Sequence, residues 1–118
     1  IECCNVNGNA AAGGCISCED ISGSASAGRD LECGDISGNV TAGKDLSCND
    51  IDGNASAGKN LSCNDVGGSA SAGGDLECND IGGHANANGT INNGSIGGNA
   101  KASVICCDSI EGSAFYQQ

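Results

Sequence analysis

The chain has 118 residues and, with 15 acidic and 4 basic side chains, a formal net charge of −11 at pH 7. This charge argues against nucleic acid or an anionic membrane surface as a partner, and no apolar run is long enough to span a membrane. The chain contains 21 Gly, no Trp and no Met, so it lacks the large side chains that a compact globule would bury. Its length fits one domain, residues 1–118.

A repeat of fifteen residues runs through the whole sequence. Residues 31–45 (LECGDISGNVTAGKD), 46–60 (LSCNDIDGNASAGKN) and 61–75 (LSCNDVGGSASAGGD) are near copies of one another. A fixed period of this length is typical of a solenoid, in which each repeat forms one coil and neighbouring coils stack. We predict eight coils, the seventh one residue short, which begin at Ile1, Ile16, Leu31, Leu46, Leu61, Leu76, Ile91 and Ile105.

Within each coil the residue types alternate in the manner of two strands. Leu or Ile at position 1 and Cys at position 3 flank a polar position 2, which predicts a short strand. Ile or Val, Gly, Ala and Ala at positions 6, 8, 10 and 12 alternate with polar residues, which predicts a longer strand. Turn-forming residues fill positions 4–5 and 13–15. The fold class is therefore all-β, a flattened two-sheet β-solenoid (β-helix) with a stacked cysteine ladder.

Glycine occupies position 8 of every coil, from Gly8 to Gly112. Two explanations are open at this stage. Either the two walls approach too closely for a side chain, or the backbone needs a positive φ angle.

Ten cysteines favour an oxidising compartment, so we expect a secreted, extracellular protein. A first residue of Ile and the lack of Met resemble a mature chain after signal-peptide removal. Coils stacked about 4.8 Å apart bring in-register Cα atoms within disulfide range, which predicts rung-to-rung bonds. The alternative is a stack of buried free thiols. The ladder comprises Cys3, Cys18, Cys33, Cys48, Cys63, Cys78 and Cys107, with pairs expected at Cys3–Cys18, Cys33–Cys48 and Cys63–Cys78.

The other cysteines cluster near the two ends of the sequence. Cys4 and Cys15 could staple the first coil, and Cys106 adjoins Cys107 in the last. A metal site is not expected, because the CxxC motif that ends at Cys18 has no second matching pair and His84 is far along the chain.

An aspartate column follows the cysteine column. Neighbouring carboxylates one rung apart repel by roughly 1 kcal/mol in water, so something should offset the repulsion. Either each Asp caps its own turn, or the column binds Ca²⁺ weakly. No cofactor is expected beyond that Ca²⁺ possibility, since known nine-residue calcium repeats do not match this period. The column consists of Asp20, Asp35, Asp50, Asp65 and Asp80.

Small uncharged residues are expected on the outward face of the longer strand. They form a flat polar array that consists of Ser24, Ser26, Asn39, Thr41, Asn54, Ser56, Ser69 and Ser71. In general layout this array resembles the ice-facing side of β-solenoid antifreeze proteins. It departs from the paired-Thr motif of the insect versions, since Thr41 is its only Thr. The resemblance implies ice binding; an ordinary solvated sheet face is the alternative.

An enzyme is not expected, because no Ser–His–Asp set, phosphate loop or cleft is apparent. The leading hypothesis is a secreted structural protein that stacks end to end with other copies into a disulfide-stabilised extracellular fibre. Its basis is the weak capping of the end coils and the paired cysteines Cys3-Cys4 and Cys106-Cys107. Ice binding is the alternative, with a surface-adhesion or cation- or sugar-binding module as a third. Phe115 and Tyr116 could instead form a lid that stops stacking.

Overall fold

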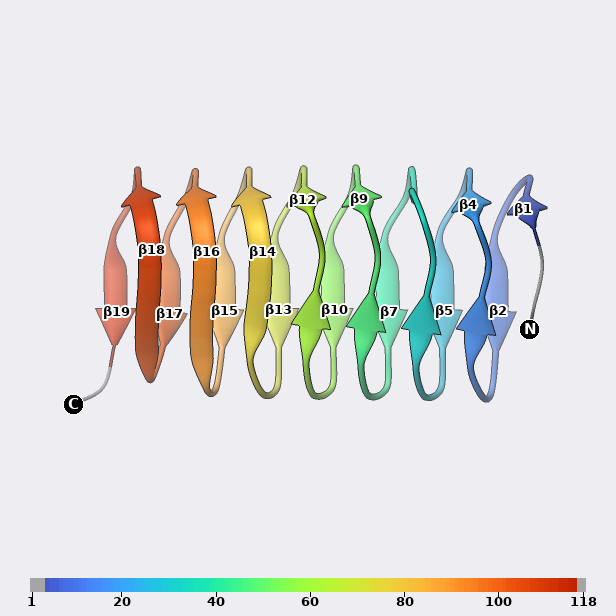
Figure 1. Cartoon of the computed structure of the whole chain (residues 1–118), viewed down its shortest axis with the longest axis horizontal. Coiled ribbons are helices and arrows are strands. Elements are labelled where there is room, and N and C mark those ends of the chain that lie inside the picture. Colours follow the sequence, from blue (N-terminus) through green and yellow to red (C-terminus); the bar gives the residue numbers. More distant parts are fainter. Residues whose placement is uncertain (1–3, 117–118) are drawn as a thin grey trace.

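The computed structural model describes residues 4–116 and shows a parallel β-solenoid of about 7 turns with coils of about 15 residues (Figure 1). The molecule measures 41 × 21 × 14 Å, with the coils stacked along the longest dimension. The sequence predicted eight coils. The first of these is only partly seen, because residues 1–3 lie outside the described residues.

One wall of the solenoid, here called the alanine sheet, contains positions 10–12 of successive coils. These positions are rich in Ala, whose small side chain allows the two walls to pack closely. The sheet has eight strands: β2 (Ala10–Ala12), β5 (Ala25–Ala27), β7 (Val40–Ala42), β10 (Ala55–Ala57), β13 (Ala70–Ala72), β15 (Ala85–Ala87), β17 (Ala100–Ala102) and β19 (Ala114–Tyr116).

The opposite wall, here called the cysteine sheet, contains positions 1–6. Its main path comprises β3 (Ile16–Ser17), β6 (Leu31–Glu32), β8 (Leu46–Ser47), β11 (Leu61–Ser62), β14 (Leu76–Ile81), β16 (Thr90–Ile96) and β18 (Val104–Ile110). Short strands at positions 5–6 extend the same wall in the earlier coils: β1 (Asn5–Val6), β4 (Asp20–Ile21), β9 (Asp50–Ile51) and β12 (Asp65–Val66).

The position of the bend corrects the strand limits expected from the sequence. Positions 4–5 were expected to turn. In the first five coils the chain does bend at position 4, whereas β14, β16 and β18 run through positions 4–5 without interruption. A further bend, which was not expected, lies at positions 7–9 before each strand of the alanine sheet. The period-2 pattern does not reveal this bend, because Ile51 before it and Ala55 after it are both buried.

All described strand pairs are parallel and join equivalent positions of neighbouring coils. Leu61 pairs with both Leu46 and Leu76, fifteen residues away, and Ile91 pairs with Ile105 across the shortened coil. This register stacks identical side chains into columns. The inward columns form the core, which includes Leu31, Leu46, Leu61, Leu76, Ile21, Ile36, Ile51, Ile81, Ala55, Ala70 and Ala85.

The glycine column reflects close stacking of neighbouring coils. Among the described residues, Gly8 is the only one with a positive φ, which is 119°. At Gly53 and Gly68, a Cβ atom would meet the backbone carbonyl of the glycine one coil earlier, at 2.6 and 2.8 Å. The side chain is therefore excluded by the preceding coil, and not by the opposite wall.

The part of the chain that the structure describes contains no helix with the length and apolar character of a membrane span.

Candidate functional site

A ladder of side-chain hydrogen bonds runs along position 9, here called the position-9 ladder. The backbone N–H of Asn54 donates to Oδ1 of Asn39, and the N–H of Ser69 donates to Oδ1 of Asn54, both at 2.8 Å. Each side chain therefore satisfies the backbone of the next coil. The remaining rungs join Ser24 to Asn9, Asn39 to Ser24, His84 to Ser69, Asn99 to His84 and Ser113 to Asn99.

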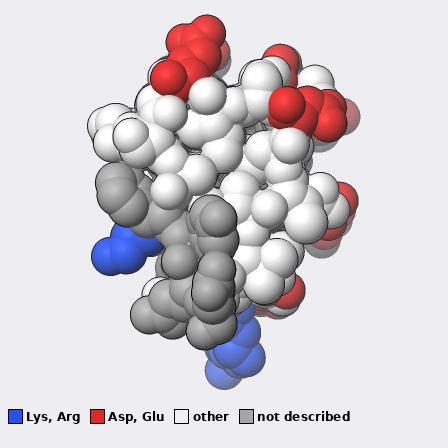
Figure 2. Space-filling model, turned by 90° about the vertical axis from the view of Figure 1, so that its left-hand side faces the viewer, with Lys and Arg blue, Asp and Glu red and all other residues white. Residues whose placement is uncertain are grey.

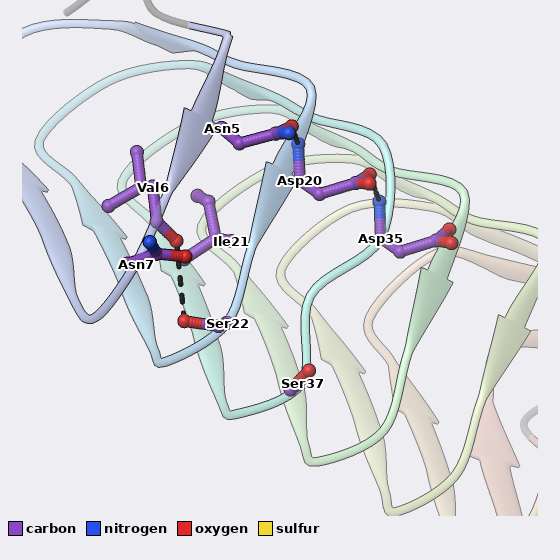
Figure 3. Close-up of a pocket in the computed structure, with 8 residues that line it drawn as sticks. All are labelled: Asn5, Val6, Asn7, Asp20, Ile21, Ser22, Asp35 and Ser37. Atoms are coloured by element: carbon purple, nitrogen blue, oxygen red, sulfur yellow. Dashed lines mark hydrogen bonds between the residues drawn. The ribbon is translucent and has the colours of Figure 1, made fainter.

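The aspartate column makes a second ladder of the same kind. Oδ1 of Asn5 accepts from the N–H of Asp20, and Oδ1 of Asp20 accepts from the N–H of Asp35 (Figure 3). The amide of Asn64 donates to Asp50 at 3.1 Å. One of the two expectations was that each Asp caps its own turn. At Asp20, Asp35, Asp50 and Asp80 the hydrogen bonds instead join the carboxylate to the next coil.

Position 15 carries a third ladder. Asp45 donates its N–H to Asp30, Asn60 to Asp45, Asp75 to Asn60 and Thr90 to Asp75, at 2.9–3.2 Å. All three ladders run in one direction, with the side-chain acceptor on the earlier coil and the N–H donor on the later one. The turns are thus fixed by neighbours along the stack.

The predicted Ca²⁺ ligands do not form a ligand cage. Within residues 4–116, no group of three or more His, Cys, Asp or Glu side chains is arranged to hold a metal ion. Oδ1 of Asp65 is buried and has no hydrogen-bond partner in that region. Ca²⁺ needs six to eight oxygen ligands around one point, whereas a column presents its carboxylates along a line.

A shallow pocket of about 250 Å³ lies beside the first coils (Figure 3). Val6 and Ile21 supply its apolar surface, and Asp20 and Asp35 line its acidic side. Ligand pockets usually start near 300 Å³ and enclose their ligand. This pocket is smaller and open, so it does not indicate a small-molecule site.

The flat polar array predicted from the sequence is placed by the structure on the alanine sheet and the bend before it. Ser26, Thr41, Ser56 and Ser71 are the central residues of β5, β7, β10 and β13 and are exposed. They align in register, since Ser56 pairs with both Thr41 and Ser71. Ser24, Asn39, Asn54 and Ser69 belong to the position-9 ladder. We call these eight residues the neutral face.

Charged side chains are almost excluded from the two columns that form this face. Positions 9 and 11 of the coils, from Asn9 to Phe115 in sequence, contain one charged residue, Lys101. The whole chain has 15 acidic and 4 basic residues. Viewed along the stack from its C-terminal side, acidic side chains gather along the upper and right-hand outline, and basic ones along the lower and left-hand outline (Figure 2). Between Asn9 and Asn99 the face is uncharged.

The cysteine column is present, but the predicted rung-to-rung disulfides are not found among the described residues. Cys33, Cys48, Cys63 and Cys78 are thiols. In-register parallel strands hold their Cα–Cβ bonds parallel, so the Cβ atoms stay about 4.8 Å apart. A disulfide prefers a Cβ separation of about 3.8 Å. The Cα spacing used in the prediction would allow a disulfide, whereas the Cβ spacing is too long for one. Cys3 lies outside the described residues.

Successive thiols of the column influence one another's pKa values. Hydrogen bonding to Cys33 raises the pKa of Cys48 to about 12, and hydrogen bonding to Cys48 raises the pKa of Cys63 to about 12. The pKa of Cys78 is also raised, by its hydrogen bond to Cys63 and by burial. The bond that Cys48 donates lowers the pKa of Cys33. The column is thus a chain of coupled thiols in which the pKa of Cys33 is lowered and those of Cys48, Cys63 and Cys78 are raised.

The cysteines near the two ends of the chain differ from those in the middle of the column in their exposure and their neighbours. Cys4, Cys15 and Cys106 are exposed, outside the column. Asn93 replaces cysteine between Cys78 and Cys107 and is buried, with 7% of its surface exposed. Its Oδ1 accepts from the N–H of Cys78 at 3.2 Å, while its Nδ2 is buried without a partner in the described region. Asn93 therefore interrupts the thiol contacts.

Sequence reasoning did not find the role of position 9 as an acceptor. The signal was available, because the column contains Asn, Ser or His, all of which carry a hydrogen-bond acceptor, in every coil. The sequence analysis treated these residues only as outward polar groups, and so it did not predict the hydrogen bonds that they accept from the next coil.

Fold and site together define a class: a parallel β-solenoid with one uncharged outer face and an internal thiol column. Comparison with protein-family models, with curated proteins and with solved structures found no match for this chain.

Proposed function

We propose that the protein binds ice through the neutral face. The observation that carries the proposal is the near-absence of charge from this face in a chain with a net charge of −11. A charged group holds its own hydration shell, whereas small hydroxyl and amide groups accept the hydrogen-bond pattern of neighbouring water. A regular face of such groups can share one ordered water layer with a crystal surface.

The regularity of the face supports the same proposal. Ser26, Thr41, Ser56 and Ser71 recur at one strand spacing, about 4.8 Å, in an in-register sheet. Figure 1 shows little change in strand direction from β2 to β19. A repeating target such as a crystal plane fits a repeating array. A sugar polymer fits this face less well than ice does, because no Phe, Trp or Tyr lies between Asn9 and Asn99 for a sugar ring to stack on.

Rigidity comes from the position-9 ladder, which fixes one of the two columns. The amide oxygens of Asn39 and Asn54 are held by backbone N–H groups at 2.8 Å. Binding a rigid face costs less conformational entropy than ordering free side chains.

The experiment compares two double variants for ice-crystal shaping and thermal hysteresis. Thr41→Tyr with Ser56→Tyr places two large side chains on the neutral face. Ser47→Tyr with Ser62→Tyr places them on the exposed outer side of the cysteine sheet, also on neighbouring strands. We expect the first to lose at least tenfold in hysteresis activity and the second to keep it. An unmodified chain that shapes no crystals at high concentration would refute the proposal.

A second proposal is the end-to-end fibre, with another copy of the chain as partner. Two observations favour it. The ladders run in one direction along the stack. In the last coil Ile105 and Ile110 are only half-buried, whereas the equivalent Ile91 and Ile96 one coil earlier are buried. A further coil on that side would bury both, and its backbone N–H would donate the next hydrogen bond of the ladder to the side chain of Ser113. Filaments by electron microscopy, with ladders on a non-reducing gel that disappear in a Cys106→Ser, Cys107→Ser variant, would support it; a monomer at high concentration would contradict it.

A further inference from the structure

We propose that the thiol column is a binding site for soft monovalent metal ions of the Cu(I) class, each bridging two successive cysteines. The column contains five described cysteines in unbroken sequence, Cys18, Cys33, Cys48, Cys63 and Cys78, on coils that stack in register. The metal sites weighed from the sequence were the CxxC motif with His84 and weak Ca²⁺ binding by the aspartate column, and neither involved the thiol column.

The spacing of the coils selects a metal bridge over a disulfide. A bond between a soft metal ion and a thiolate is about 2.3 Å long, so a linear sulfur–metal–sulfur bridge spans about 4.6 Å. Parallel strands place equivalent side chains about 4.8 Å apart. The bridge therefore fits between two rungs with little movement, whereas a disulfide requires the Cβ atoms to approach by about 1 Å.

The one-dimensional arrangement selects the kind of ion. Each gap in the column is flanked by two sulfur atoms, and residues 4–116 contain no cluster of three or more metal-binding side chains. Zn²⁺ takes four ligands in a tetrahedron, which two thiols cannot supply. Soft thiolate ligands select Cu(I), an ion that accepts two of them.

Binding is an exchange of protons for metal and involves no electron transfer. Two thiols and one Cu(I) ion give one bis-thiolate complex with a charge of −1 and two released protons. At the pair Cys33–Cys48, as at the pair Cys63–Cys78, each sulfur releases its proton to water and keeps its electron pair for the metal ion.

Asn93 marks the end of the site. It occupies the next rung after Cys78, and its side chain is bonded to the backbone of Cys78. An amide forms no bridge of this kind with a soft ion. Cys107 therefore lies two rungs from Cys78 and outside the chain of sulfur contacts.

The test uses two double variants that remove the same number of thiols. The background replaces the six other cysteines of the full chain, at positions 3, 4, 15, 18, 106 and 107, with Ser. Into it go either Cys33→Ser with Cys78→Ser, which leaves adjacent Cys48 and Cys63, or Cys33→Ser with Cys63→Ser, which leaves Cys48 and Cys78 two rungs apart. Each protein is reduced, checked by circular dichroism and titrated anaerobically with Cu(I) against a chromogenic Cu(I) chelator.

We expect two Cu(I) ions in the four-thiol background, one in the adjacent-pair variant, and an affinity at least tenfold weaker in the separated-pair variant. Equal Cu(I) binding by the two double variants, or none in the background, would overturn the proposal. If the background does not fold, the same pairs of substitutions are made in the unmodified chain. There the proposal requires a difference of one ion between them, and no difference would refute it.

Discussion

At the scale of single residues, tightly constrained positions include the glycines at position 8 and, in the second to fifth coils, at position 13. A Cβ atom on Gly58 would collide with the carbonyl oxygen of Gly43 one coil earlier, and Gly43 itself stands in the same relation to Gly28. The backbones of neighbouring coils approach so closely at these glycines that an added Cβ atom would have to displace backbone atoms. The first coil differs, because a Cβ atom on Gly13 would have no neighbour within 4 Å.

Gly58→Ala is therefore expected to destabilise the protein, by about 1–3 kcal/mol, because the added methyl group must displace backbone atoms. Gly13→Ala adds the same group in open space, where we expect a change within about 0.5 kcal/mol. Urea unfolding followed by circular dichroism measures both. Equal effects of the two substitutions would contradict the close stacking described for this column.

The thiols of the column link stability to pH. In the folded chain Cys48 and Cys63 have pKa values of about 12, above the ordinary value of 9.0. A pKa raised by folding gives stability that is complete below about pH 9 and is lost as the pH rises through about 12. Cys33, with its lowered pKa, contributes in the opposite direction, and Cys78 in the same direction as Cys48.

Under reducing conditions, the free energy of unfolding should fall between pH 9 and pH 12. The fall should be smaller in a Cys48→Ala, Cys63→Ala variant, because two of the four described thiols with raised pKa are gone. Urea titrations at fixed ionic strength provide the measurement. Other groups that ionise in this range are the same in both proteins, so an identical slope would show that the thiol contacts contribute nothing.

At the scale of the structural element, the coil is too short to be stable alone, and its turns are held by its neighbour. Strands of two or three residues, such as β8 and β10, offer few backbone hydrogen bonds of their own. The ladders at positions 5, 9 and 15 add bonds that join one coil to the next.

Asn54→Ala is expected to cost about 0.5–1.5 kcal/mol, because the N–H of Ser69 loses its side-chain acceptor. Ser56→Ala, two residues away on the same outer face, removes an exposed hydroxyl and should change stability by less than about 0.5 kcal/mol. Thermal unfolding of both variants checks the difference. If Ser56→Ala is as harmful as Asn54→Ala, the ladder is not the source of the effect.

The sequence predicts the solenoid and its inward columns well, because period and alternation survive in the repeat. It does not locate the bend, because alternation from Ile51 through Gly53 to Ala55 continues unbroken around the corner. It does not reveal the ladders, because Asn, Asp and Ser in a turn suggest bonds within their own coil. The state of the cysteines was missed for a geometric reason, since only the Cβ atoms distinguish a bonded pair from a stacked pair.

At the scale of the whole molecule, the structure is one coil repeated by translation. Each interior coil makes the same contacts on both sides, as shown by the pairs Leu46 with Leu61 and Leu61 with Leu76. Stability in such an array is approximately a sum of coil and nearest-neighbour terms. An interior coil is therefore a removable unit, provided that the register is kept.

Deletion of residues 46–60 should leave a folded solenoid that is shorter by about one strand spacing, 4.8 Å, along its 41 Å axis. Deletion of residues 46–52 breaks the register, because residues of one sheet would enter the other, and should prevent folding. Small-angle scattering and circular dichroism distinguish the two outcomes. A folded half-coil deletion would contradict the translational repeat.

The central claim, that the neutral face binds ice, is tested most directly by partitioning during slow freezing. Unmodified chain and the Thr41→Tyr, Ser56→Tyr variant are mixed in one solution, a polycrystalline ice layer is grown slowly, and the two masses are quantified in ice and in liquid. Ice excludes ordinary solutes, so binding is seen as enrichment in the solid. The account predicts that the unmodified chain is enriched in ice at least tenfold over the variant. Equal exclusion of both proteins from the ice would contradict it.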